Sequence, residues 1–313
     1  MLRIVPATGD QLQPALELLF SEWPVDARAQ RITEIRQEIA DEEFDPEQLL
    51  LAEFDRRVVG VQLTILRDDD VGMVWPPVLD APLLKRMSGP AAEFVEDELL
   101  AEAARQLDAE DAWIGQALLE PNQLREHAAM QRNGFARLTE LRFFERLLTE
   151  SSSWARREQP VPLSYEPYRR SRNRLAFVNV LEATYRRSLD CPEFNGVRDG
   201  EQSLKNHEAA GSFGPDMWRL YRHTGVDVGI LLMAERPDQQ AWEVLYLGVV
   251  EPARGRGIGR TMLLDALNAA RDANVERLLI VADARNTPAV SLYESLGFQP
   301  VATRVAFVRL AKK

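Results

Sequence analysis

Glycines and arginines alternate over a short stretch in the second half of the chain: Arg254, Gly255, Arg256, Gly257, Gly259 and Arg260. Glycine allows positive φ and lets the backbone approach a ligand closely, and a helix start presents unpaired N–H groups and a positive dipole end. Such a turn can bind a phosphate, whose charge the arginines would complement. The alternative is a tight turn without a ligand, because glycine serves both purposes.

The apolar residues around this turn predict the elements that position it. Val244–Val250 consists mainly of β-branched, aromatic and leucyl residues, which indicates a strand buried on both faces, and Pro252 ends it. From Gly259 onward, apolar residues fall at helical spacing at Leu263, Leu264, Leu267 and Ala270. The glycines therefore lie in a strand-to-helix turn.

Two stretches resemble motifs of the GNAT N-acetyltransferase superfamily. Arg254-x-x-Gly257-x-Gly259 resembles the loop that wraps the pyrophosphate of acetyl-CoA in that family. Downstream, Asn286-Thr-Pro-Ala289 and Tyr293-Glu-Ser-Leu-Gly297-Phe298 resemble its closing motif, at the expected distance. The two motifs in this order are more specific than either alone. The resemblance implies acetyl-CoA as acyl donor and direct transfer of an acetyl group to the amine of a small molecule.

The resemblance also implies a set of cofactor-binding residues. Arg254 would anchor the turn, and the backbone of the residues that follow would hold the pyrophosphate: Arg256, Gly257, Ile258, Gly259 and Arg260. In the family, a bulge splays the preceding strand from its neighbour, and the pantetheine arm pairs with the strand there. That place is occupied here by Leu247, Val249 and Val250, with Gly248 consistent with the bulge, with a close approach, or with neither.

Two residues near the closing motif have both a catalytic and a structural interpretation. Tyr293 is the candidate general acid, because a phenol stays neutral at pH 7 and can protonate a leaving thiolate. The alternative is a core tyrosine, since Leu292 and Leu296 flank it. Asn286 would contact the pantetheine arm, cap a helix ahead of Pro288, or do both.

Glu243 is the candidate general base for the attacking amine. It opens the predicted central strand, where several members of the family place a catalytic or amine-binding glutamate. The alternative is a solvent-facing charge at the strand end. Strand alternation places Leu245 and Leu247 on the face of Glu243 and Tyr246 on the opposite face.

The segment Asp190–Gly196 follows a predicted helix, and in the family this region commonly shapes the acceptor pocket. Its two carboxylates, Asp190 and Glu193, could hold a cationic amine, although such a segment can also be a solvated turn. Cys191 is not expected to act as a nucleophile, because direct transfer needs none and no histidine is close in sequence.

Length and composition indicate two soluble domains. The chain has 313 residues, 45% of them hydrophobic, and six tryptophans, enough for two cores of about 150 residues each. No apolar run approaches the roughly 20 residues of a membrane span, and no signal segment opens the chain, so we expect a cytoplasmic protein. One cysteine excludes an internal disulfide, and three scattered histidines indicate no metal site.

The net charge of −11 is unevenly distributed. Residues 1–160 hold 17 Lys and Arg against 31 Asp and Glu, a balance of −14, whereas residues 161–313 hold 21 against 18, a balance of +3. The less acidic half contains the glycine-rich turn, which suits a polyphosphate cofactor. The acidic half argues against nucleic acid and anionic membranes as partners. The oligomeric state cannot be predicted.

The same order of elements is predicted twice. The first half should contain strand Leu2–Val5, helices 10–20 and 26–43, strands Leu49–Phe54, Val58–Leu66 and Val71–Leu79, helix 91–107, strand Ala112–Ala117, helix Asn122–Gln131 and strand Leu138–Leu147. The second should contain a strand from Leu163, helices 172–188 and Glu201–Ala210, strands Met217–Arg222, Val228–Ala234 and Val244–Val250, helix 259–273, strand Arg277–Ala282, helix Pro288–Leu296 and strand Arg304–Leu310.

Landmark residues support a duplication. Pro6 matches Pro167 at an offset of 161, Asn122 matches Asn286 at 164, and Gly134 matches Gly297 at 163. We therefore predict an α/β protein of two tandem GNAT-like domains, 1–150 and 163–313, joined by the linker 151–162. Each should be a mixed, mostly antiparallel sheet flanked by helices.

The first copy has lost the features that the resemblance links to catalysis. The segment Ala81–Pro90, at the place of the glycine-rich turn, has one glycine and two prolines, which lack backbone donors, and Met130 stands where the second copy has Tyr293. We expect a degenerate domain beside a catalytic one. A non-catalytic acyl-CoA-binding sensor or scaffold is the alternative function, and an O-acyltransferase or a transferase of longer acyl chains is a lesser variant.

Overall fold

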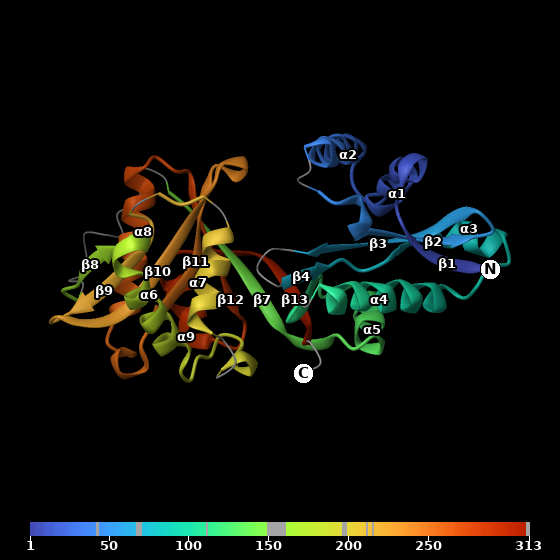
Figure 1. The fold of residues 1–313 in the computed structure, drawn as a ribbon. Coiled ribbons are helices and arrows are strands. Elements are labelled where there is room, and N and C mark those ends of the chain that lie inside the picture. The colour runs from blue at the N-terminus through green and yellow to red at the C-terminus, as the bar shows by residue number, and fades with distance from the viewer. Residues whose placement is uncertain are drawn as a thin grey trace. The chain divides into compact units, whose positions relative to one another are not determined.

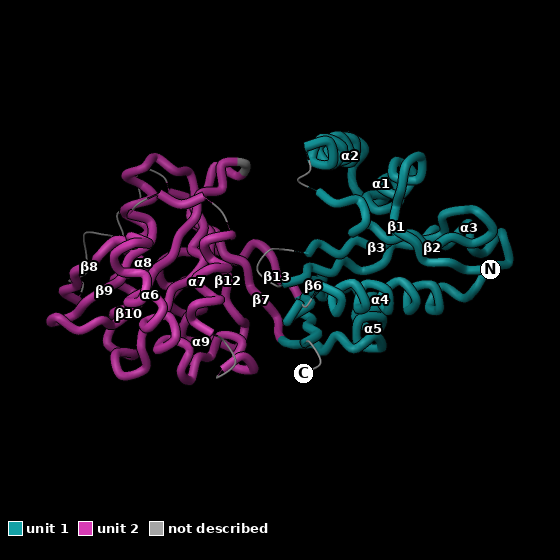
Figure 2. The backbone as a smooth tube through the Cα atoms, in the orientation of Figure 1, with its two compact units in different colours: residues 1–138, 305–313 teal, residues 139–304 magenta. Residues whose placement is uncertain are grey.

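The computed structural model describes residues 1–41, 44–66, 71–110, 112–148, 161–195, 199–210, 212–214 and 216–310, without the side chain of residue 238. The chain folds as two compact α/β units (Figures 1 and 2). Unit 1 comprises residues 1–138 and 305–313, and unit 2 comprises residues 139–304. Most of the predicted linker lies outside the described residues.

Unit 1 is a mixed sheet between two layers of helices. Its strands are β1 (Leu2–Pro6), β2 (Leu49–Phe54), β3 (Arg57–Leu66), β4 (Val71–Val74), β5 (Val78–Leu79), β6 (Ile114–Leu119) and the end of β13 (Gln299–Leu310). Its helices are α1 (Leu12–Leu19), α2 (Val25–Ala40), α3 (Ala81–Arg86), α4 (Ala92–Ala109) and α5 (Leu124–Arg132). The strand order is β1-β2-β3-β4-β6-β13, with β5 beside β3, and among the described strands of this unit β4 and β6 are the one parallel pair.

Alternating residues of β2 divide the core of unit 1. Leu49 and Leu51 pack with α1 and α2, whereas Leu50 and Ala52 pack with α4 and α5. A sheet that buries both faces needs apolar residues at nearly every position, which explains the continuous run in β2. Figure 1 shows the two helical layers on opposite sides of these strands.

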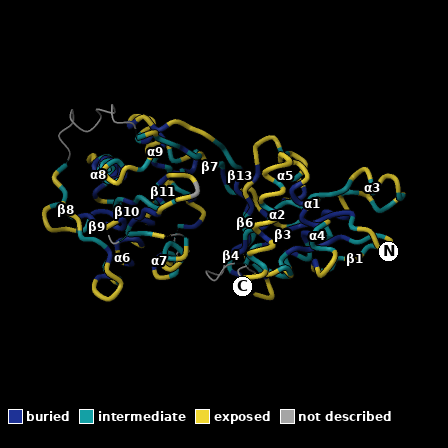
Figure 3. Tube along the Cα trace, turned by 90° about the horizontal axis from the view of Figure 1, so that it is seen from above, coloured by how far each residue is buried: buried dark blue, intermediate teal, exposed yellow. Residues whose placement is uncertain are grey.

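Unit 2 repeats this plan. Its strands are the end of β7 (Ala136–Leu147), β8 (Ser164–Pro167), β9 (Arg219–His223), β10 (Val226–Arg236), β11 (Ala241–Val249), β12 (Arg277–Asp283) and the start of β13. Its helices are α6 (Arg170–Tyr185), α7 (Gly200–Ala209), α8 (Ile258–Asp272) and α9 (Thr287–Ser295). The order from the edge inward is β8-β9-β10-β11-β12-β7, antiparallel except for β11 with β12. Buried residues follow the strands, and exposed ones gather on loops and outer helix faces (Figure 3).

Each half of the sequence gives its last strand to the sheet of the other half. β7 pairs with β12 over Leu141–Leu147, and β13 pairs with β6 over Val305–Leu310. The compact units therefore do not coincide with the linear ranges 1–150 and 163–313. Whether those ranges represent two ancestral domains stays a prediction.

The repeat is visible in the elements themselves. Pro6 ends β1 and Pro167 ends β8, while β7 and β13 begin and end at an offset of 163 residues. Gly134 and Gly297 both have positive φ after the preceding helix, at 82° and 79°. The predicted α/β fold class with mixed sheets flanked by helices is confirmed. The short helix α3, which Asp80 caps through Leu83 N–H at 2.8 Å, was not predicted.

Within the described ranges, no helix combines the length and the apolar composition that crossing a bilayer would require.

The exchange of strands predicts how fragments of the chain behave. A fragment of residues 163–304 lacks β7, so the edge of β12 is unpaired and the pocket of the buried Phe144 is empty. Loss of one buried phenylalanine costs about 3–5 kcal/mol, so this fragment should aggregate or melt without a cooperative transition in calorimetry. The matched fragment 139–304 keeps β7 and should unfold cooperatively. Equal melting behaviour of the two fragments would contradict the place of β7 in this sheet.

Candidate functional site

A cavity of about 590 Å³ lies in unit 2 where two parallel strands separate. β11 and β12 pair over Ala241–Val244 and Arg277–Ile280 and then diverge. The cavity opens beyond this point, between the second half of β11, the start of α8, β12 and α9. The predicted site residues that line it are Asp190, Leu247, Val249, Arg254, Gly257, Ile258, Gly259, Arg260, Asn286 and Tyr293.

A β-bulge causes the strands to part. Leu232 pairs with Tyr246 and Met233 with Val244, so Leu245 is an extra residue on β11. The bulge therefore lies at Leu245, three residues before Gly248, the residue that the sequence suggested for it. The sequence predicted a strand buried on both faces over Val244–Val250. The structure differs, because the second half of β11 borders the cavity and is only partly buried.

The bulge also reverses the expected alternation of side chains. Tyr246 and Glu243 pair with Leu232 and Ala234, which are two residues apart on β10, so they share one face. Leu247 lies on the opposite face, toward α8. The prediction that Tyr246 faces away from Glu243 was wrong, because one inserted residue inverts every later position.

Gly248 packs against α6 rather than forming the bulge. A Cβ at this position would lie 2.6 Å from the Tyr246 ring and 2.8 Å from Thr184. The two hydroxyl groups of Tyr246 and Thr184 are hydrogen-bonded at 2.7 Å. The missing side chain of Gly248 thus lets α6 approach β11 beside the cavity.

The glycine-rich turn has the backbone geometry of an anion site. Gly255 and Gly257 have φ of 73° and 79°, and Gly257 is the N-cap of α8. Among the described residues, a Cβ at Gly257 would come within 4 Å of Val161 alone, at 3.5 Å, and the constraint shown there is the positive φ. The first N–H groups of α8 have no acceptor within the helix, and the residues at this positive end of the helix dipole line the cavity.

Arg254 fastens this turn to the end of α6. Its guanidinium donates to the carbonyl oxygens of Val249 at 2.9 Å, Thr184 at 2.7 Å and Arg187 at 2.9 Å. The Thr184 carbonyl lies in the last turn of α6, where carbonyls have no intrahelical donor, and the Arg187 carbonyl lies two residues beyond the helix.

The remaining cationic and strand residues differ in position. Arg260 lines the cavity and donates to the Ser295 hydroxyl at 2.7 Å. Arg256 is exposed and is not among the lining residues. Val250 does not line the cavity either, and its N–H donates to Val228.

Tyr293 reaches the cavity from α9. Its side chain is 5% exposed, and its ring contacts Phe144 of β7 at 5.8 Å between centroids. Burial, with a smaller contribution from the charge of Asp190, raises the pKa of the Tyr293 hydroxyl well above its ordinary value. The phenol therefore stays protonated throughout the neutral range. Tyr293 both packs in the core and borders the cavity, so its interpretations as a core tyrosine and as a general acid are compatible.

Asn286 likewise combines two positions. Its side chain accepts a hydrogen bond from Ala289 N–H at 3.3 Å as the N-cap of α9, and the residue lines the cavity.

Glu243 is not brought to the cavity. Its carboxylate forms an ion pair with Arg236, with Nη2 to Oε2 at 2.6 Å, and its side chain is about one quarter exposed. Arg236 in turn donates to Ala210 at the end of α7. If Glu243 is the general base, it must accept the proton from this position outside the cavity.

The two predicted substrate carboxylates are separated. Asp190 lines the cavity, whereas Glu193 lies outside it and accepts two hydrogen bonds from Arg285, at 2.6 and 2.9 Å. The Arg285 guanidinium holds the pKa of Glu193 below its ordinary value. Gly196, the last residue of this predicted segment, lies outside the described residues.

Sequence reasoning missed a buried carboxylate next to the cavity. Asp283 ends β12 and is fully buried. Burial would raise its pKa, but hydrogen bonds from Arg285, Thr139 and Cys191 outweigh this and hold the pKa below its ordinary value. An acidic residue that ends an apolar strand shortly before the closing motif was the available signal.

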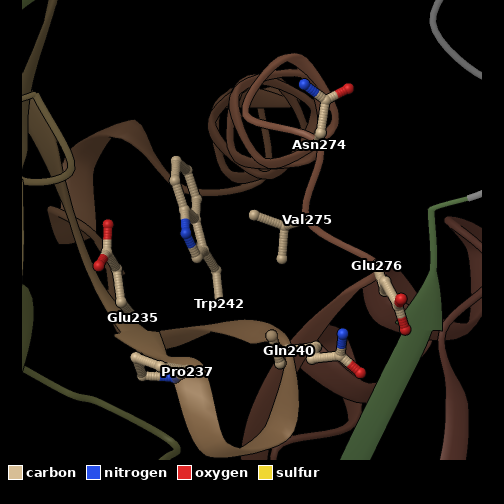
Figure 4. A pocket seen from close by; sticks show the side chains of 8 residues that line it. Glu235, Pro237, Gln240, Trp242, Asn274, Val275 and Glu276 are labelled. Carbon is tan, nitrogen blue, oxygen red and sulfur yellow. The ribbon is translucent and has the colours of Figure 1, made fainter.

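A second pocket of about 340 Å³ lies at the other end of β11 (Figure 4). Trp242 stands there between Glu235 and Val275. None of the predicted site residues lines this pocket.

Residues 181–298 match the family described as Acetyltransferase (GNAT) family. Among curated relatives named mycothiol acetyltransferase, that of Jonesia denitrificans is 28% identical over 143 residues, covering 38% of this chain and 46% of the relative. That of Thermobispora bispora is 34% identical over 102 residues, covering 31% and 35%. The chain thus matches less than half the length of these relatives.

Solved structures of GNAT proteins are similar to this chain in fold. A GCN5-related N-acetyltransferase from Sphaerobacter thermophilus is 16% identical, with a TM-score of 0.62 over 99% of this chain and 95% of that one. A tandem GNAT protein from the clavulanic acid biosynthesis pathway is 15% identical, with a TM-score of 0.53 over 100% and 99%. At these identities the comparison concerns the fold alone.

The hydrogen bonds of Arg254 predict a stability effect. Arg254→Ala removes three bonds and leaves carbonyl groups unpaired, so unfolding should become easier by about 2–4 kcal/mol, measured by thermal denaturation. Arg254→Lys should recover little, because an ammonium lacks the planar fork of donors. Arg256→Ala is the control, since Arg256 is exposed, and should stay within about 0.5 kcal/mol of wild type. If Arg254→Ala also lowers the free energy of unfolding by less than about 0.5 kcal/mol, these hydrogen bonds do not hold the turn.

Proposed function

We propose that this protein is an acetyl-CoA-dependent N-acetyltransferase with its active site in the cavity of unit 2, because residues 181–298 match the GNAT acetyltransferase family. One observation carries the proposal. The splayed β11, the positive-φ glycine turn at the start of α8 and the buried phenol of Tyr293 all border the same cavity.

The chain's residues fit the donor. The pyrophosphate would bind the first N–H groups of α8, from Gly257 to Arg260, with the charge of Arg260 beside them. The pantetheine arm would lie along the free edge of β11 at Leu247–Val250, within reach of Asn286. Bound acetyl-CoA would supply the acetyl thioester. Arg256, exposed outside the cavity, would contribute mainly long-range charge.

The reaction requires three proton movements. The acceptor ammonium loses one proton before its nitrogen can attack the carbonyl carbon. The nitrogen loses a second proton after attack, and the sulfur takes one up when the C–S bond breaks. Tyr293 would donate to the sulfur. Glu243 is the base proposed from the sequence, and from its position with Arg236 it would act through water.

A non-catalytic acyl-CoA sensor is the second candidate. The observation in its favour is that Glu243 forms an ion pair outside the cavity, so that a base in direct contact with the acceptor would have to be another group. Binding of acetyl-CoA without transfer to any amine would favour this function.

Unit 1 would be a non-catalytic companion. At the place of the glycine-rich turn it has α3, capped by Asp80, and buried Met130 stands where unit 2 has Tyr293. The acceptor is proposed to be a small-molecule amine. The names of the relatives make the deacetylated form of mycothiol one amine to test.

Cofactor binding can be tested at the turn. Gly257→Glu combines a strained positive φ with a negative charge at the proposed pyrophosphate site, so calorimetric titration should show one equivalent of acetyl-CoA for wild type and none for the variant. Gly225→Glu is the matched control: Gly225 has φ of 81° in the β9–β10 turn, outside the cavity, and should leave binding unchanged. If wild type binds no acetyl-CoA, the turn is structural and the proposal fails.

Removal of the Tyr293 hydroxyl should separate chemistry from binding. Tyr293→Phe keeps the ring against Phe144 and should lower kcat about 10²- to 10⁴-fold in a thiol-release assay, with acetyl-CoA affinity within twofold. Because the pKa of Tyr293 is raised, its protonated form persists to higher pH, and wild-type kcat should not fall from loss of this proton below about pH 10. Unchanged kcat in the variant would exclude Tyr293 as the acid.

A further inference from the structure

We propose that Asp190 binds the ammonium group of the acceptor and so makes the protein selective for small amines that are cationic at neutral pH. The inference rests on the proposed function, which it deepens by naming the chemistry of the acceptor and the residue that selects it.

Among the described residues that line the cavity, Asp190 is the one with a carboxylate. The cationic lining residues, Arg254 and Arg260, belong to the turn and α8. A carboxylate repels a polyphosphate donor, which favours placing Asp190 at the end of the cavity that receives the acceptor. Asp190 also lies close enough to Tyr293 for its charge to influence the phenol, which puts it near the proposed proton donor.

Local hydrogen bonds fix the loop that carries Asp190. The Ser188 hydroxyl accepts from Asp190 N–H at 3.1 Å, and the Ser188 carbonyl accepts from the Asn195 amide at 2.9 Å. Cys191, the next residue, has a left-handed φ of 47°, which a buried non-glycine residue adopts only where surrounding contacts impose it. The loop is therefore held in one course after α6.

A reciprocal pair of hydrogen bonds attaches this loop to β12. The Asp283 backbone N–H donates to Asp190 Oδ1 at 2.9 Å, and the Cys191 N–H donates to Asp283 Oδ2 at 3.1 Å. Thr139 of β7 donates to the other oxygen of Asp283 at 2.7 Å. Buried Asp283 thus acts as a positioning residue, and a strand from the first half of the sequence contributes to the acceptor side of the site.

The other acidic candidates are engaged elsewhere. Glu193 pairs with Arg285, Glu243 with Arg236, and Glu251 with Arg187 at 2.9 Å, and none of these three glutamates lines the cavity. Since one carboxylate borders the cavity and three neighbours do not, the assignment to Asp190 can be tested against matched variants.

The experiment compares Asp190→Asn with Glu193→Gln in the full chain. Asparagine keeps an oxygen that can accept from Asp283 N–H but removes the charge, and Glu193→Gln removes a charge from the same loop outside the cavity. Thiol release would be measured at saturating acetyl-CoA with ethanolamine, tyramine, glucosamine and the deacetylated form of mycothiol. Acetyl-CoA binding would be measured by calorimetry.

Asp190→Asn should raise the KM for the best amine at least tenfold, with kcat changed less and acetyl-CoA affinity within twofold. Glu193→Gln should leave all three within twofold, and Asp190→Glu should recover part of the amine KM.

An unchanged amine KM in Asp190→Asn, or an equal rise in Glu193→Gln, would overturn the assignment while leaving the transferase intact. A rise in KM accompanied by an equal loss of acetyl-CoA affinity would also overturn it, because that pattern indicates a disturbed loop rather than a lost ion pair. If wild type binds acetyl-CoA but acetylates none of the amines, the proposed function fails first, and this inference with it.

Discussion

The extra residue Leu245 on β11 is the constraint on which the site depends. Backbone groups of a strand need partners on both edges, and two parallel strands normally supply them to each other. Because the bulge turns β11 away from β12 after Val244, one edge of β11 keeps β10 and the other borders the cavity. The cavity, the face on which Tyr246 lies and the close approach of α6 at Gly248 all follow from this insertion.

An open cleft in a sheet has to be held open by its surroundings. Here two charged side chains, those of Arg254 and Asp283, hold it open through hydrogen bonds with backbone groups. Arg254 joins the turn to the end of α6 and to Arg187 just beyond it, and Asp283 joins the loop after α6 to the end of β12. Both walls of the cavity are thus attached to the end of α6 or to the loop that follows it. Charge-assisted bonds to backbone groups are among the stronger hydrogen bonds, which suits a site that must not collapse.

The sequence contained most of the fold but not its local irregularities. Periodicity located nearly every element, and the glycines placed the turn, because each of these signals is local. The bulge was misplaced because Leu245 is one apolar residue among several and nothing in its identity marks it as extra. The partner of Glu243 could not be foreseen, since Arg236 is adjacent only through pairing of β10 with β11. The exchange of β7 and β13 was invisible because two copies of one strand offer the same pattern to either sheet.

The same exchange imposes an order of events during synthesis. Residues up to Leu138 of unit 1 leave the ribosome long before Val305–Leu310, the segment that pairs with β6. At about 5–20 residues per second, the intervening chain takes on the order of 10–30 s to make. Throughout that interval one edge of β6 has no partner strand, whereas β7 has already been synthesised when β12 emerges. Unit 2, although later in the sequence, can therefore pair β7 with β12 before β6 of unit 1 meets β13, and the nascent unit 1 keeps an unpaired strand edge for the longer time.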